Sequence, residues 1–178
     1  MTQPDLNDRP DITDSTARMA DGTSIAYSLR AGTGGRRLAL LHSLAMDRHF
    51  WDPVLAELPA ELSVLAIDCR GHGASGKPAG PYSVERLADD LAAVMDRIGW
   101  DDAVVAGASM GGSVTLAFAA RHPARTTGLG LIDTTAWYGA DAPAAWAERG
   151  ARAVEKGFGA MVDFQTTRWF TDGFREAH

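Results

Sequence analysis

Short segments rich in apolar residues alternate with amphipathic segments along the first two-thirds of the chain. Four such segments have the character of strands buried in a parallel sheet, and they span residues 38–41, 62–67, 103–106 and 126–132. Helical patterns stand between them, at residues 50–58, 84–98 and from a glycine-rich turn at 107–112 to about residue 122. This alternation predicts an α/β fold, with a mainly parallel twisted sheet and helices on both of its faces.

A different pattern precedes the first of these strands. Residues 1–15 are polar and acidic, have no apolar stretch of a signal peptide, and are expected to form a loose leader. Extended segments at 16–19 and 23–30 flank Asp21-Gly22, a dipeptide that strongly favours a two-residue hairpin turn. We therefore expect an N-terminal antiparallel hairpin.

The pattern changes again after Asp133, where no further strand is predicted. Residues 142–156 and about 159–170 are helical and rich in alanine. The aromatic residues of this part are Trp137, Tyr138, Trp146, Phe158, Phe164, Trp169, Phe170 and Phe174. Such a composition is typical of a helical lid over an apolar cleft, although many of the rings would also serve to pack lid against body. The predicted organisation is a leader (1–15), an α/β core (16–136) and the start of a helical lid (137–178).

Composition and charge narrow the classes of function. The net charge of -6, without any basic stripe, argues against nucleic acid, and no apolar run is long enough for a membrane helix. The lone Cys69 excludes an internal disulfide, fits a reducing cytoplasm and is expected to be a packed side chain rather than a reactive thiol. No histidine–carboxylate cluster has metal-ligand spacing, so neither a metal nor an organic cofactor is expected.

The strongest chemical signal is Gly107-Ala-Ser109-Met-Gly111, between a predicted strand and a predicted helix. A serine in a tight strand-to-helix turn projects its hydroxyl from the sheet, and small residues two before and two after it avoid a collision. The helix N-terminus favours negative charge there, so the backbone amide of Met110 is a candidate oxyanion donor. We predict that Ser109 is a nucleophile; the alternative is a structural glycine turn.

These segments resemble the α/β-hydrolase superfamily. The resemblance rests on Leu40-Leu-His42-Ser-Leu44, on Asp68-Cys-Arg70-Gly-His72-Gly-Ala-Ser75 and on the turn around Ser109. It implies that Leu44 supplies a second oxyanion amide, although the family usually has His-Gly where this chain has His42-Ser43. His42 is expected to hold its own loop rather than act as the catalytic base, and Arg70 and His72 are expected to brace neighbouring loops.

Within that superfamily the chain is most similar to 3-oxoadipate enol-lactonases. The sequence motifs that carry this likeness are His42-Ser-Leu44 with Phe50-Trp-Asp-Pro53, the segment from Asp68 to Ser75, and Thr167-Arg168-Trp169-Phe170. The likeness implies a small acidic lactone or ester as substrate, with Arg168 facing its carboxylate. A solvated lid arginine is the alternative, because Arg149, Arg152 and Arg175 are near in sequence. Ser43 and Trp137 are further expected substrate-binding residues.

A catalytic histidine is not found where the superfamily places it, after the nucleophile and the acid. The histidines after Ser109 are His122, at the far end of the helix that follows it, and the terminal His178. Asp133, at the end of the next strand, is a candidate acid. The sequence is therefore compatible with a fragment of a split enzyme, with part of a longer protein, or with a short protein without turnover. We expect a missing C-terminal segment, because the strand at 126–132 would otherwise leave an apolar sheet edge uncovered.

The predicted function is hydrolysis of a small ester or lactone through an acyl-enzyme on Ser109. Carbon–carbon bond hydrolysis and perhydrolysis use the same catalytic groups and remain alternatives in the same fold. A ligand-binding domain that kept the turn but lost catalysis is the alternative from another class.

Overall fold

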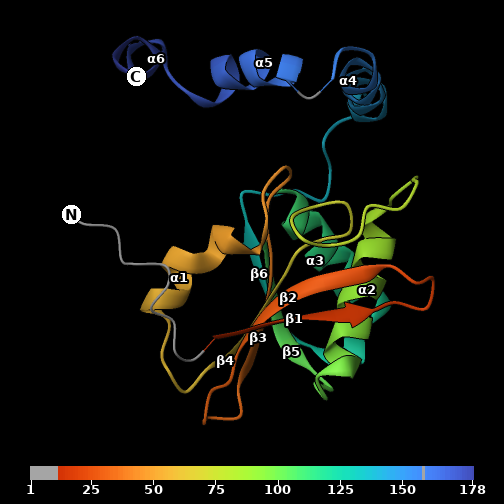
Figure 1. Cartoon of the computed structure of the whole chain (residues 1–178), viewed down its shortest axis with the longest axis vertical. Coiled ribbons are helices and arrows are strands. Elements are labelled where there is room, and N and C mark those ends of the chain that lie inside the picture. The colour runs from red at the N-terminus through yellow and green to blue at the C-terminus, as the bar shows by residue number, and fades with distance from the viewer. Residues whose placement is uncertain (1–11, 158) are drawn as a thin grey trace. The chain divides into compact units, whose positions relative to one another are not determined.

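The computed structural model describes residues 12–157 and 159–178. It separates into two compact units, one that ends at Ala136 and one from Trp137 to His178. Each unit is described by itself below, with the elements labelled in Figure 1.

The first unit is built on one mixed sheet. Its described strands are β1 (Ile12–Arg18), β2 (Ser24–Arg30), β3 (Arg37–Leu41), β4 (Ser63–Ile67), β5 (Ala103–Ala108) and β6 (Thr126–Ile132). The strand order is β1-β2-β4-β3-β5-β6. β1 and β2, and β2 and β4, pair antiparallel, whereas β3 pairs parallel with β4 and β5, and β5 with β6. The predicted mainly parallel sheet with an N-terminal hairpin is confirmed.

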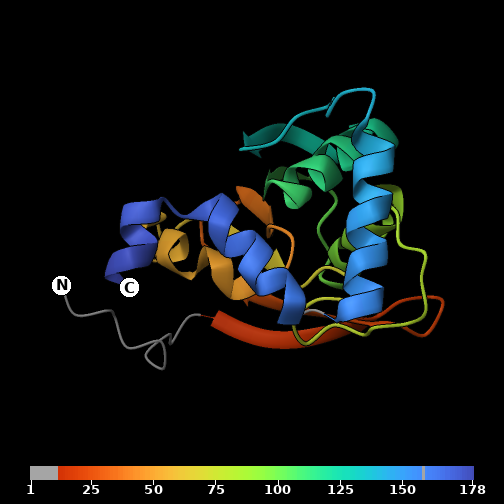
Figure 2. The ribbon, with the colours of Figure 1, turned by 90° about the horizontal axis from the view of Figure 1, so that it is seen from above.

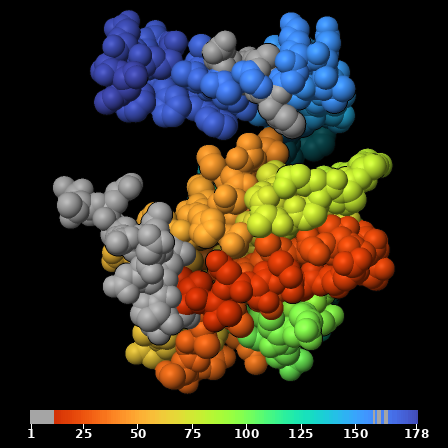
Figure 3. Space-filling view, viewed as in Figure 1, coloured from red at the N-terminus to blue at the C-terminus, as the bar shows by residue number. Residues whose placement is uncertain are grey.

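The hairpin is longer than its sequence pattern indicated. β1 begins at Ile12, which pairs with Arg30, so the prediction of a loose leader is wrong for residues 12–15. Residues 1–11, the rest of that prediction, lie outside the described residues. The strand was missed because it lies at the sheet edge with mostly exposed side chains, and edge strands tolerate polar residues. Its position over one face of the unit is visible in Figure 3.

Helices cover both faces of this sheet. α2 (Val84–Arg97) and α3 (Met110–Arg121) pack on one face, and the 3₁₀ helix η1 (Arg48–Trp51) with α1 (Asp52–Glu57) packs on the other (Figures 1 and 2). Successive residues of β3 divide between the faces, because Leu41 belongs to the core cluster under α2 and α3, and Leu40 to that under α1. Ser83 caps α2 as expected, its hydroxyl accepting the Arg86 N–H at 3.2 Å.

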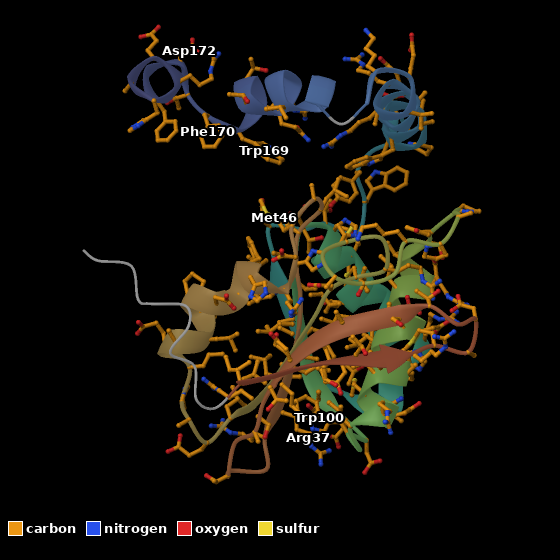
Figure 4. The ribbon with its side chains drawn as sticks, in the orientation of Figure 1. Arg37, Met46, Trp100, Trp169, Phe170 and Asp172 are labelled. Atoms are coloured by element: carbon orange, nitrogen blue, oxygen red, sulfur yellow. The ribbon has the colours of Figure 1, made fainter. Side chains whose placement is uncertain are left out.

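The second unit is helical in its described residues. It contains α4 (Ala142–Lys156), α5 (Gly159–Trp169) and α6 (Asp172–Ala177). The first two helices were expected, whereas α6 was not; it begins where the Thr171 hydroxyl accepts the Phe174 N–H at 3.3 Å. Trp169, Phe170 and Asp172 mark the passage from α5 to α6 in Figure 4, and Phe158 lies outside the described residues. No helix among the described residues of either unit is long and apolar enough to cross a membrane.

Candidate active site

Ser109 lies in a strained turn between β5 and α3. Its φ is 52° and its ψ is -112°, a region that costs energy for any residue other than glycine. The turn is held by β6 and by the segment that follows it, since the Ser109 N–H donates to the Ile132 carbonyl at 2.9 Å and the Thr134 hydroxyl donates to the Ser109 carbonyl at 3.0 Å. The residue itself is half-buried rather than enclosed.

Two glycines allow the crowding that this turn requires. A Cβ on Gly107 would lie 2.2 Å from the backbone carbonyl of Gly111, and a Cβ on Gly111 would lie 2.2 Å from the Leu41 carbonyl oxygen. The first turn of α3 therefore touches both β5 and the end of β3. The expectation that bulk two residues before or after Ser109 would collide is confirmed.

The N-terminus of α3 points its free amides toward the turn. The first amides of a helix have no acceptor within the helix, and they carry the positive end of its dipole. Met110 is the first residue of α3, and the Ser109 side chain makes no capping hydrogen bond that would occupy its hydroxyl. The amide of Met110 therefore lies at the positive end of α3, and its role as an oxyanion donor stays a prediction.

The loop after β3 lies against the same turn. A Cβ on Gly111 would also lie 2.7 Å from the His42 carbonyl oxygen, so this loop and the start of α3 are in close contact. Ser43 and Leu44 begin a tight turn in which the Met46 N–H donates to the Ser43 carbonyl at 3.2 Å and Ala45 has a φ of 62°. The structure therefore places the His42 carbonyl, directly before Ser43 and Leu44, against the first turn of α3. Met46, 41% exposed, is labelled in Figure 4, at the opposite end of the sheet from Arg37.

His42 is fully buried and both of its ring nitrogens are engaged. Nε2 accepts the Cys69 N–H at 3.0 Å, and Nδ1 lies 2.7 Å from the Ser43 carbonyl oxygen. Because a backbone N–H can only donate and a carbonyl can only accept, Nδ1 carries the proton and the ring is neutral. Burial also lowers the pKa of His42 below its ordinary value. His42 thus holds its own loop, as expected, and has no nitrogen available as a catalytic base.

A buried carboxylate that the sequence analysis did not single out joins this loop to the one after β4. Asp68 accepts hydrogen bonds from the Arg48 N–H at 2.7 Å, the Arg48 guanidinium at 2.7 Å and the Ala74 N–H at 2.8 Å. Gly73 passes so close that a Cβ there would lie 2.3 Å from the Asp68 carboxylate. The sequence signal that could have predicted this role of Asp68 is an aspartate directly after a buried strand and before two spaced glycines.

The remaining residues of the segment from Asp68 to Ser75 are structural. The Arg70 guanidinium forms a bidentate pair with Asp90 of α2, at 2.7 and 2.8 Å, and reaches Asp21 of the hairpin at 2.7 Å. His72 packs its ring 5.1 Å from that of His42. The bracing role expected of Arg70 is therefore present. Cys69 is buried, and burial raises the pKa of its thiol to about 12, which fits the packed side chain that was expected.

His122 was expected to lie far from Ser109, and Asp133 was the candidate acid. His122 ends α3, where its Nε2 lies 3.1 Å from Asp89 of α2. The length of α3 separates it from Ser109 by roughly 18 Å at 1.5 Å per residue. Asp133 is exposed, with a φ of 47°, and directly follows Ile132, whose carbonyl accepts the Ser109 N–H. Among the described residues, no histidine is hydrogen-bonded to Ser109.

Two expected substrate-binding residues belong to the second unit. Trp137 is 72% exposed, and Arg168 lines a cavity formed by α4, α5 and the residues just before α4. Tyr138, Trp146 and Arg149 line the same cavity but were not predicted as binding residues. For Trp146 and Arg149 the available signal was their spacing of three residues along α4, whereas Tyr138 precedes that helix.

The fold and this strand–turn–helix define the class of protein. Residues 37–170 match the alpha/beta hydrolase fold family, and the chain belongs to that family. The chain is 33% identical to 3-oxoadipate enol-lactonase 2 of Acinetobacter baylyi over 157 residues, which are 88% of this chain and 58% of the lactonase.

Solved structures of hydrolases also superpose on this chain. A hydrolase from Pseudomonas aeruginosa superposes with a TM-score of 0.83 at 34% identity, over 92% of this chain and 61% of that one. The enol-lactonase from Burkholderia xenovorans superposes with a TM-score of 0.81 at 34% identity, over 92% and 62%. This chain therefore spans about three-fifths of the length of these relatives.

Proposed function

We propose that this chain carries the nucleophile and the oxyanion site of a serine hydrolase that cleaves a small ester or lactone. The observation that carries the proposal is the strained, half-buried Ser109 at the N-terminus of α3. In the proposed reaction the Ser109 hydroxyl adds to the substrate carbonyl while a base takes its proton. The amides of Met110 and Leu44 stabilise the resulting oxyanion. The ester C–O bond then breaks as the leaving oxygen takes the proton from the base, and water hydrolyses the acyl-enzyme to release the acid and restore the Ser109 hydroxyl.

The base in this proposal is a histidine from a C-terminal segment outside these 178 residues. Three observations support it. The described histidines of the first unit each have a ring nitrogen engaged with a group other than Ser109, and the chain spans 58% of the Acinetobacter lactonase. β6, at the end of the sheet, also exposes Leu129, Leu131 and Ile132 by 45–46%, as an uncovered strand would. Asp133 is the proposed orienting acid, because it directly follows the residue that bonds the Ser109 amide.

The proposed substrate is a carboxylate-bearing enol-lactone or a related small ester. This assignment is supported by the likeness to the Acinetobacter and Burkholderia enol-lactonases. Arg168 is the proposed partner of the substrate carboxylate, and Ser43 and Trp137 are the other proposed substrate-binding residues. A cytoplasmic location completes the proposal.

A fluorophosphonate probe tests the nucleophile directly, because it reacts with a serine only when that serine is activated. The complete protein, including its C-terminal segment, should be labelled at Ser109, and Ser109→Ala should abolish both labelling and ester hydrolysis. Ser113→Ala is the matched control, since Ser113 lies one turn along α3 and bonds to Ser109 through its backbone N–H alone. It should keep labelling within about twofold of the parent.

The same experiment separates the alternatives. Saturable binding of a small acid without labelling of the complete protein would contradict the hydrolase and favour a ligand-binding domain. If Ser109 is labelled, a panel of esters, lactones, diketones and peracid-forming reactions distinguishes ester hydrolysis from carbon–carbon bond hydrolysis and perhydrolysis, which use the same nucleophile.

A further inference from the structure

The second unit contains a cavity of about 440 Å³, which is within the usual size for a small-molecule site. Its described lining includes two alanines of α4 and the side chains of Tyr138, Trp146, Glu148, Arg149, Arg152 and Arg168. Most of these residues come from α4 or from just before it, and Arg168 comes from α5. The cavity is therefore formed within the second unit.

Positive charge predominates among the described lining residues. The described lining contains three arginines and one carboxylate, Glu148, which pairs with Arg152 at 2.8 Å along α4. Burial lowers the pKa of the half-buried Arg149, and the neighbouring charge of Arg168 lowers it further. The charges of Arg149 and Arg168 are thus close enough to interact, and an anion bound between them would be attracted by both.

Aromatic rings form the other part of the lining. The rings of Tyr138 and Trp146 meet edge to face, with centroids 6.4 Å apart and planes at 87°. The Arg149 guanidinium carbon lies 5.0 Å from the centroid of the Trp146 ring, which orients the cation on an aromatic face. A flat apolar group can therefore pack on aromatic surface close to the charged groups.

We propose that this cavity binds a small planar carboxylic acid, with its carboxylate between Arg149 and Arg168 and its body against Trp146 and Tyr138. Guanidinium groups suit a carboxylate because their N–H donors match its two oxygens. The binding site does not depend on the role of Ser109. Only the identification of the bound acid with the acid part of the substrate rests on the proposed function.

Calorimetric titration of the full chain carrying Ser109→Ala tests the site without any contribution from catalysis. Benzoate is the planar acid, benzamide its neutral counterpart and inorganic phosphate an anion without an aromatic body. We expect benzoate to bind at one site at least about tenfold more tightly than either of the others, and more weakly at high salt. Arg149→Gln and Arg168→Gln should each weaken benzoate binding by about tenfold, because each removes a charge-assisted hydrogen-bond donor.

Two further variants separate specific binding from general attraction of anions. Arg175→Gln is the matched control, since Arg175 lies on α6, pairs with Asp172 and does not line the cavity; it should leave benzoate affinity unchanged. Trp146→Leu should weaken benzoate but not phosphate. Circular dichroism of each variant checks that the helices still form.

The proposal is overturned if benzamide or phosphate binds as well as benzoate, or if Arg175→Gln weakens binding as much as Arg168→Gln. Failure of the proposed function is seen separately, as absence of fluorophosphonate labelling. Benzoate binding by the arginine pair would then still stand, as a site unconnected with hydrolysis at Ser109.

Discussion

At the scale of single residues, the site depends on side chains whose hydrogen bonds allow one protonation state. His42 is the clearest case, because a backbone donor faces one ring nitrogen and a backbone acceptor faces the other. A second proton would place an N–H against the Cys69 N–H in a buried position. The neutral ring therefore fixes the loop that carries Ser43 and Leu44.

This arrangement predicts a pH dependence of stability. The pKa of His42 is lowered in the folded state, whereas in the unfolded chain it is about 6.5. The unfolded state then binds more protons below that value, so the contribution of His42 is complete above about pH 6.5 and is lost progressively as the pH falls below it. Urea unfolding between pH 5 and pH 8 gives the free energy of unfolding of the parent and of His42→Gln. The contribution of His42 is the difference between the two proteins in how steeply that free energy changes with pH.

Nitrogen-15 NMR gives a second measurement that needs no variant. The His42 Nε2 resonance should remain that of an unprotonated nitrogen at pH 6. A His42 ring that is half-protonated at pH 6.5 would contradict the neutral buried ring. The same pH dependence of the unfolding free energy in the parent and in His42→Gln would contradict it too.

At the scale of elements, the turn around Ser109 depends on close approach of β3, β5, β6 and α3. The strain at Ser109 persists because hydrogen bonds from both flanks of the turn and two glycine contacts leave no relaxed alternative. The loops after β3 and β4 are joined to each other by Asp68. The candidate site is thus formed where the carboxyl ends of parallel strands meet.

Substitution of Gly107 tests this close approach. Gly107→Ala should lower the free energy of unfolding by about 2 kcal/mol or more, because the added methyl would meet the backbone of Gly111 rather than a flexible side chain. Gly128→Ala on β6 is the control, since its added Cβ would lie 3.4 Å from Val104, an ordinary contact. Urea denaturation of both variants gives the comparison, and equal losses would contradict the crowding at the turn.

At the scale of the whole molecule, the feature with the largest consequence is the exposed end of the sheet. Leu129, Leu131 and Ile132 of β6 are each nearly half exposed, and Val104 of the adjoining strand is 38% exposed. An apolar strand at a sheet edge is a template for pairing with another chain. The 178-residue chain in isolation should therefore self-associate.

Charged substitutions on β6 test that expectation. Leu129→Lys and Leu131→Lys should each reduce self-association of the isolated chain, measured by sedimentation velocity, because a lysine on an edge strand opposes pairing. Val54→Lys, on α1 and 42% exposed, is the matched control and should have little effect. In the longer protein of the proposed function, the same β6 substitutions should instead lower stability. An unchanged association state of the isolated chain would count against an uncovered edge.

The sequence specified most of the fold because its signals were local. The apolar runs of β3 to β6, the Ser83 cap of α2 and the Asp21-Gly22 turn are each formed by residues within a few positions of one another. β1 was the exception in the first unit. Its exposed polar residues carry no periodicity, and only pairing with β2 makes Ile12–Arg18 a strand.

The candidate site likewise combines features encoded locally in the sequence with features that depend on contacts between distant elements. The sequence by itself determined the cramped Gly-x-Ser-x-Gly turn and the helix behind it, because two glycines and a serine within five residues dictate that backbone. Only the tertiary structure decided which distant groups meet in the loops beside them: the three donors that meet on Asp68, and the backbone groups that keep His42 neutral. These contacts depend on desolvation and on the approach of separate elements, which no local spacing encodes.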